Sequence, residues 1–125
     1  MPDVTYSINA NLAKGALSQT FVAAGVTADM TASGLATQTL SPGTNAAGTA
    51  AISTATLSSV GLFFARNLST VSTATVSFGQ LSGGSLVTCV SLRGGEAAMG
   101  RLAAGNYAAQ SNLTGTQLVI TILEG

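Results

Sequence analysis

The sequence predicts an all-β protein, an antiparallel β-sandwich with a jelly-roll-like arrangement of strands. Short stretches alternate between apolar and polar residues with a period of two, and turn residues recur about every ten positions. The many Ala residues are interleaved with Thr, Ser and Gly, so the β-branched pattern outweighs the helix propensity of Ala. A chain of 125 residues needs only one core, and we therefore assign residues 1–125 to a single sandwich domain.

The first half of the chain contains three predicted strands and one loop. Residues 4–12 place apolar side chains at every second position, which indicates a half-buried strand. Residues 26–32 repeat the pattern, and residues 35–40 follow after a Ser-Gly break. We expect these two segments to pair as a hairpin or as neighbouring strands. Residues 44–51 show no clear period and are predicted to form a loop.

The second half carries the stronger strand signals. Residues 60–65 form an apolar run short enough for a strand covered on both faces, and we expect this segment to be the central core strand. Polar turns then lead to strands at residues 74–78 and 86–92, which predicts two successive hairpins. Further strands are expected at residues 97–102, 107–111 and 118–123.

Core positions follow from these strands. We expect Phe63, Phe64, Ile120 and Ile122 to be buried, because each lies on a strand of the predicted sandwich. The aromatic residues are spread along the chain and are interpreted as core fillers, not as a stacking platform for bases or sugars. These aromatic residues are Tyr6, Phe21, Phe63, Phe64, Phe78 and Tyr107.

The composition excludes several classes of function. Four basic and four acidic residues leave no cationic surface for a phosphate backbone, so we expect no nucleic-acid partner. The chain has no His and one Cys, which removes His-based triads, His metal sites and internal disulfides. The longest uncharged stretch is rich in Ser, Thr and Gly, so no membrane span is predicted. We predict that the protein is not an enzyme, and we assign no catalytic, cofactor-binding or metal-binding residue.

Three local features were weighed as possible sites. Residues 43–49 have the outer spacing of a phosphate loop, but Thr49 stands where a lysine is required. Glu96 is close in sequence to Arg93 and Arg101, and we expect an ion pair that stabilises a turn. Cys89 lies on a predicted strand, where a free Cys is usually a small buried hydrophobe.

Several segments together resemble small virion proteins of tailed bacteriophages. These segments are residues 14–17 (KGAL), 61–69 (GLFFARNLS), 76–79 (VSFG), 92–96 (LRGGE), 101–105 (RLAAG) and 107–110 (YAAQ). The resemblance implies a β-sandwich in which an aromatic strand, an Arg-Asn-Leu turn and a turn ending in Gly-Glu have a structural role. The chain departs from that pattern at Gly94, where we would expect Pro.

The resemblance and the composition lead to one functional expectation with two alternatives. The leading expectation is a virion structural protein, most specifically a capsid decoration or cement protein that is made in the host cytoplasm and binds the capsid protein as a homotrimer. A neutral surface of small residues favours such assembly. The first alternative is a tail, neck or fibre component, or a filament subunit whose strand completes the sheet of the next copy. The second is a carbohydrate-binding module, which the absence of Trp disfavours.

Overall fold

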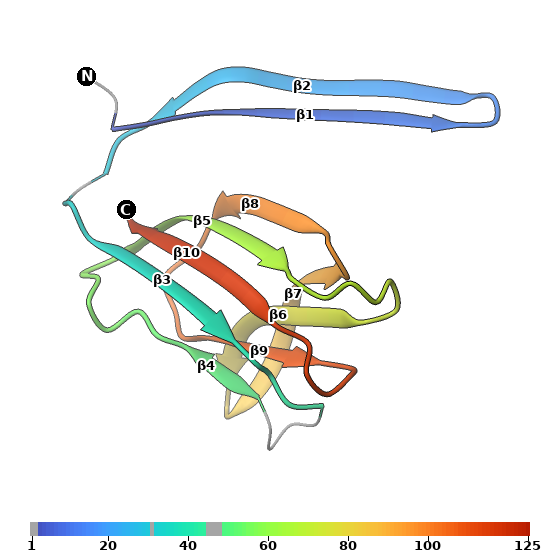
Figure 1. The fold of residues 1–125 in the computed structure, drawn as a ribbon. Helices are drawn as coiled ribbons and strands as arrows, with labels where there is room; N and C mark the ends of the chain where they lie inside the picture. Colours follow the sequence, from blue (N-terminus) through green and yellow to red (C-terminus); the bar gives the residue numbers. More distant parts are fainter. Residues whose placement is uncertain (1–2, 31, 45–48) are drawn as a thin grey trace. The chain divides into compact units, whose positions relative to one another are not determined.

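The structure, a computed structural model, describes residues 3–30, 32–44 and 49–125. Across these residues the chain forms ten β-strands and no helix, and every strand pairing is antiparallel. The strands are β1 (Val4–Lys14), β2 (Leu17–Ala28), β3 (Leu35–Leu40), β4 (Ala50–Ile52), β5 (Val60–Asn67), β6 (Thr75–Ser82), β7 (Ser85–Arg93), β8 (Ala97–Arg101), β9 (Tyr107–Ser111) and β10 (Leu118–Glu124). The prediction of an all-β chain with antiparallel sheets is confirmed (Figure 1).

The chain divides into two compact units, residues 1–31 and residues 32–125. The first unit holds only the two-stranded sheet β1-β2, and the second holds the eight remaining strands. We predicted one sandwich across residues 1–125, whereas the sandwich strands all come from the second unit. The reason is that β1 and β2 pair only with each other.

The first unit is a long hairpin that we call the arm (β1 and β2). Its two-residue turn begins at Gly15, whose φ of 57° suits the first central position of a type II′ turn. Near the base, Ser7 faces two residues of β2, one of which is Gly25 with φ of 64°. The amide of Gly25 donates a hydrogen bond to Oγ of Ser7 at 3.2 Å, and this stabilises the bulge.

This bulge explains why one predicted pairing was wrong. The extra residue shifts the apolar alternation of β2 from odd to even positions, so only the part after Gly25 showed a clear period. Residues 26–28 therefore complete β2 of the arm. The segment at residues 35–40 is β3, which pairs with β10. Thr31, part of the predicted strand at residues 26–32, lies outside the described residues.

The second unit is built from two four-stranded sheets, which we call sheet I (β3-β10-β5-β8) and sheet II (β4-β9-β6-β7). The strand pairs are nested, because β3 pairs with β10, β4 with β9, β5 with β8 and β6 with β7. Strand β5 lies in the interior of sheet I, as predicted for the central core strand.

Only one of the two hairpins predicted in the second half forms. Strands β6 and β7 make the expected hairpin through Gly83 and Gly84, both with positive φ. Strands β5 and β6 do not pair, because they belong to different sheets and the chain crosses the sandwich between them. The predicted loop at residues 44–51 also needs correction, since Ala50 and Ala51 are part of β4 and residues 45–48 lie outside the described residues.

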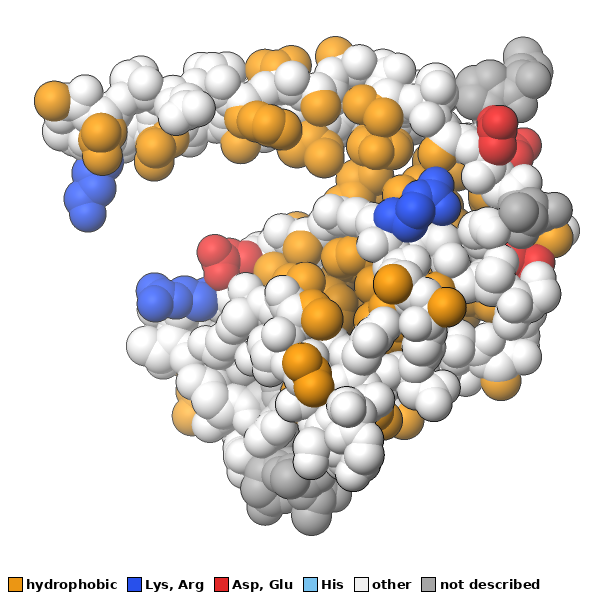
Figure 2. Space-filling view, turned by 180° about the vertical axis from the view of Figure 1, so that it is seen from behind, with side chains coloured by type: hydrophobic (Ala, Val, Ile, Leu, Met, Phe, Trp, Pro, Cys, Tyr) orange, Lys and Arg blue, Asp and Glu red, His pale blue; other side chains and the backbone are white. Residues whose placement is uncertain are grey.

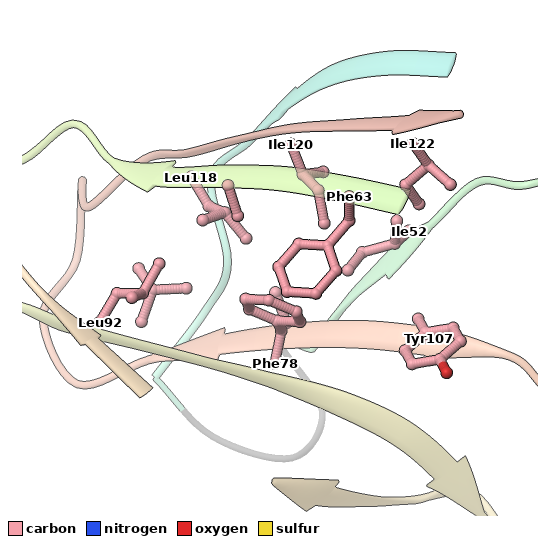
Figure 3. Close-up of a cluster of buried hydrophobic side chains, with 11 residues drawn as sticks. Ile52, Phe63, Phe78, Leu92, Tyr107, Leu118, Ile120 and Ile122 are labelled. Carbon is pink, nitrogen blue, oxygen red and sulfur yellow. The ribbon is translucent and has the colours of Figure 1, made fainter. Parts of the chain in front are cut away.

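The core fills the space between the two sheets (Figure 3). The rings of Phe63 and Phe78 meet edge to face with centroids 5.4 Å apart, one ring from each sheet. The strand β10 alternates as expected, and Leu118, Ile120 and Ile122 are fully buried. Phe64 is only half-buried, so its prediction was wrong. It lies next to Phe63 on β5 and therefore points to the opposite face of sheet I.

Candidate functional site

The carboxylates of the chain are spread over separate local elements. Oδ2 of Asp3 accepts a hydrogen bond from the amide of Met30 at 2.8 Å, and Oε1 of Glu124 accepts one from the hydroxyl of Ser58 at 2.6 Å. No group of three or more His, Cys, Asp or Glu residues that could hold a metal ion occurs among the described residues. These carboxylates stabilise local backbone and side-chain positions. Asp3 and Asp29 flank the Val4–Ala28 pair at the base of the β1-β2 hairpin, whereas Glu96 and Glu124 lie in the second unit.

Glu96 stabilises a turn with Arg93, one of its two expected partners, but the bonds are made by the backbone of Arg93. Its Oε1 accepts a hydrogen bond from the backbone amide of Arg93 at 2.6 Å. The amide of Glu96 donates in turn to the carbonyl of Arg93 at 3.0 Å, so the two residues close the turn between β7 and β8. Glu96 therefore stabilises this turn, as expected, and it does so through hydrogen bonds to the backbone of Arg93.

The two motifs that carried the virion resemblance meet at Asn67. The backbone amide of Asn67 donates to the carbonyl of Glu96 at 3.0 Å, and the amide of Gly95 donates to the carbonyl of Asn67 at 2.9 Å. The side chain is fully buried, and its Nδ2 donates to the carbonyls of Ala74 and Leu92, both at 3.0 Å. Asn67 therefore joins the Arg-Asn-Leu turn, the Gly-Glu turn and both sheets, which is a structural role.

Cys89 is exposed, so the prediction of a buried Cys was wrong. The pairing of β6 with β7 steps from Phe78–Val90 to Gly79–Thr88, which leaves Cys89 as the extra residue of a bulge. A bulge reverses the alternation of inward and outward side chains, and β7 is also an edge strand. The sequence shows the strand but does not show the bulge, so it placed Cys89 on the wrong face.

The arm is amphipathic, and its apolar face lies along one side of the ribbon. Cross-strand pairing puts Ile8, Ala10 and Leu12 of β1 on the same face as Ala23, Phe21 and Gln19 of β2. The opposite face is polar at most positions. The exposed fractions of Leu12, Leu17 and Phe21 are 52%, 64% and 59%. Figure 2 shows hydrophobic side chains gathered along one side of this ribbon.

Phe21 was predicted to be a core filler, and the structure places it on the arm instead. The two-stranded sheet of the arm contains no second layer of its own, and the side chain of Phe21 is 59% exposed. The signal that could have revealed the arm was present in the alternation of Leu17, Gln19, Phe21 and Ala23. We did not recognise that segment as a strand.

Sheet I also carries apolar residues on its outer face. The register aligns Phe64 with Thr121 of β10 and with Met99 of β8, and it aligns Leu35 with Leu123. Leu35 is 58% exposed, and Phe64, Met99 and Leu123 are half-buried. The same face also carries Thr37, Thr121, Arg66 and Arg101, so apolar and polar side chains are mixed on it.

The outer face of sheet II is polar in comparison. A shallow hollow of about 300 Å³ lies over this face. It is lined by Thr44, Thr75, Ser77, Leu86, Thr88, Gln110, Ser111 and Asn112. None of these side chains is aromatic or charged, so the hollow offers hydroxyl and amide groups but no group suited to acid or base catalysis. The two sheets therefore present chemically different surfaces.

Comparisons with protein-family models, with curated proteins and with solved structures gave no match to this chain. Within the part of the chain that the structure describes, no helix is long and apolar enough to cross a membrane. The functional argument therefore depends on the arm, on the outer face of sheet I and on the composition of the chain.

Proposed function

We propose that this protein is a structural component of a tailed-phage virion, most specifically a capsid decoration or cement protein. In this role it binds the outside of the shell, ties neighbouring subunits together and acts as a homo-oligomer, with a trimer preferred. Its partners are other copies of itself and the major capsid protein, not a small substrate. The resemblance of residues 61–69 and 92–96 to such proteins supports this proposal.

The single observation that carries the proposal is the apolar face of the arm. An isolated two-stranded hairpin is marginally stable in water at best. The arm nevertheless exposes Leu12, Leu17 and Phe21, each by more than half. Burying a side chain of this kind stabilises a contact by roughly 1.5–3 kcal/mol. Exposed apolar faces of this kind mark surfaces that bind another protein, and a protein that works as many copies on a shell has such partners.

The architecture of the second unit supports the same role. It is built from two antiparallel four-stranded sheets, and we propose that its nested strand pairs follow a jelly-roll-like arrangement, a design that recurs in capsid proteins. Fold alone does not establish function. The eight charged residues add an independent argument, because a surface with so few charges has little repulsion between copies.

A tail, neck or fibre component, or a subunit of a filament, is the second candidate. The observation that favours it is the edge position of β7, which runs from Ser85 to Arg93 without Lys or Pro, two residues that commonly protect an edge strand; the bulge at Cys89 is its one irregularity. A strand from another copy could extend sheet II at this edge. A carbohydrate-binding module is less well supported, because the hollow on sheet II has no aromatic side chain for a sugar ring.

Co-sedimentation with undecorated capsid shells tests the proposal. We expect the full chain to bind such shells in a fixed ratio to the capsid protein and to raise the temperature at which the shells break down. Binding to isolated tails instead of shells would favour the second candidate. A chain that binds neither assembly would overturn the proposal of a virion protein.

A further inference from the structure

A second hollow lies where β5 ends, between two turns of the eight-stranded unit. Its volume is about 520 Å³, and it is lined by residues 66–70 and by Gly94 and Gly95. The first group belongs to the end of β5 and the turn that follows it, and the two glycines belong to the turn between β7 and β8. All of the lining residues therefore come from the second unit.

The backbone of the two turns holds the hollow in shape. The amide of Gly95 donates a hydrogen bond to the carbonyl of Asn67 at 2.9 Å. A Cβ at Gly94 would overlap the carbonyl oxygen of Val71, so the two turns already pack closely there. The buried side chain of Asn67 adds three hydrogen bonds to backbone groups. A hollow that is built before a ligand enters lowers the entropy cost of binding.

The side chains that line the hollow supply hydrogen-bond donors. Arg66 is exposed, and among the described residues its guanidinium takes part in no hydrogen bond or ion pair. Oγ of Ser69 accepts from the amide of Val71 at 3.1 Å, which leaves its proton free to donate. Thr70 adds a second hydroxyl, and none of the lining residues is acidic. The hollow therefore offers a planar cation and two hydroxyl donors to a negatively charged acceptor.

The balance of charge in the second unit points to the same kind of ligand. Residues 32–125 contain three arginines and two glutamates. Glu96 is not among the lining residues, and its Oε1 accepts from the amide of Arg93 at 2.6 Å. Glu124 is 6% exposed and accepts from the hydroxyl of Ser58. The exposed charge of this unit is therefore mainly positive, which complements an acidic partner.

We propose that this hollow binds a carboxylate from an acidic segment of a neighbouring protein in the assembly. A carboxylate only accepts hydrogen bonds, and a guanidinium binds it through two parallel N–H···O bonds. The volume of the hollow lies in the usual range of ligand pockets. A phosphate is a weaker match, because phosphate sites gather several cations or successive backbone amides, and a single arginine lines this hollow. The inference rests on the proposed virion function and names the chemistry of its partner.

An NMR titration of the full chain tests the class of ligand. The probe is an N-acetylated tetraglutamate peptide, and a tetraglutamine peptide is its neutral control. We expect the glutamate peptide to shift the backbone amide signals of residues 66–70 and 94–95, and the glutamine peptide to leave them in place. The response should weaken in 1 M NaCl, because the Debye length falls to about 3 Å. Inorganic phosphate is the third probe and should shift these signals less than the glutamate peptide does.

Matched arginine variants test the role of Arg66. Arg66→Gln removes the charge from the hollow, whereas Arg101→Gln removes an exposed charge from β8, outside the hollow. We expect Arg66→Gln to weaken binding of the glutamate peptide and of undecorated capsid shells about tenfold, and Arg101→Gln to weaken both by less than about threefold. Arg66→Lys should restore only part of the binding, because an ammonium group lacks the planar fork. Far-UV circular dichroism and the urea midpoint confirm that each variant is folded.

Four results would overturn the inference. These are no shift with the glutamate peptide, an equal shift with the glutamine peptide, a larger shift with phosphate, and a folded Arg66→Gln variant that binds the peptide like the wild type. A stronger response from Asp29→Asn than from the wild type would also overturn it, since a carboxylate of the chain's own arm would then occupy the hollow.

The two proposals can fail separately. Shell binding by the wild type and by Arg66→Gln alike, with no response to the glutamate peptide, would remove the carboxylate site and leave the proposed function intact. A glutamate peptide that binds at the hollow of a chain that binds no shell would leave the carboxylate site intact and remove the proposed function.

Discussion

The side-chain amide of Asn67 donates a hydrogen bond of 3.0 Å to the backbone carbonyl of Leu92, and this bond joins the two sheets inside the sandwich. The same nitrogen donates to the carbonyl of Ala74, and Oδ1 accepts from the amide of Ser69 at 3.0 Å. Every polar atom of this buried side chain is therefore paired, which is the condition under which a buried amide stabilises a fold.

The first prediction concerns this amide. Asn67→Ala leaves two buried carbonyls and one amide without their partner, so we expect the free energy of unfolding to fall by about 3 kcal/mol. Asn112→Ala is the matched control. Asn112 makes the same kinds of bond, to Thr75 and Thr73, but on the surface, and its loss should cost about 1 kcal/mol. Urea denaturation measures both, and equal losses would contradict the central role of Asn67.

The second prediction compares two neighbouring rings. Phe63 is 5% exposed and packs on Phe78, so Phe63→Ala should cost about 3–5 kcal/mol. Phe64 is half-buried on the outer face of sheet I, and Phe64→Ala should cost about 1–2 kcal/mol. Denaturation at a concentration where the chain is monomeric removes any contribution from association. A larger loss for Phe64 than for Phe63 would mean that the faces of β5 are assigned the wrong way round.

The third prediction tests the bulge of β7. A Cβ at Gly79 would overlap the carbonyl oxygen of Val87 and approach the amide nitrogen of Cys89, because β7 passes close to this residue. Backbone cannot move aside as a flexible side chain can, so Gly79→Ala should cost about 2–3 kcal/mol. Gly83→Ala is the control, because it introduces the strain of a positive φ without a steric overlap. Gly83 has open space around it and φ of 60°, and we expect a cost of about 1 kcal/mol there.

The fourth prediction concerns the thiol of Cys89. Because the residue is exposed, a thiol reagent should label the native protein without denaturant. Cys89→Ser should also leave shell binding unchanged, since Cys89 is not part of the apolar face of the arm. Labelling that begins only as the protein unfolds would show that Cys89 is buried. Loss of assembly on reduction, or with a chelator, would contradict an assembly that needs neither disulfide nor metal.

How much of the fold the sequence could predict depends on the kind of pattern involved. Period-two alternation correctly located the strand at residues 4–12, the alternation of Leu118, Ile120 and Ile122, and the hairpin through Gly83 and Gly84. Each of these is a local property, because strand geometry and turn conformation depend on residues that are adjacent in the chain. The bulges in β2 and β7 interrupt this alternation, and for that reason the predictions for residues 26–32 and for Cys89 were wrong.

The candidate site was harder to predict from the sequence. Low charge and the absence of His were sufficient to argue against several chemistries and to favour assembly, since these are properties of composition alone. The arm was not predicted, because the alternation at residues 17–23 was not recognised as a strand, and a strand that joins the sandwich would show the same alternation as one that does not. Both kinds of strand alternate in the same way.

The sequence by itself therefore determined the strand content, most of the turns and the nearly uncharged character of the surface. Only the tertiary structure decided which strands pair, that the side chain of Asn67 joins the two sheets, and that Phe21 and Phe64 lie outside the core. The physical reason is that alternation tells which residues share a face of a strand, whereas burial depends on which sheet covers that face. That pairing is a long-range property, and among the described residues it gives β1 and β2 no strand partner except each other.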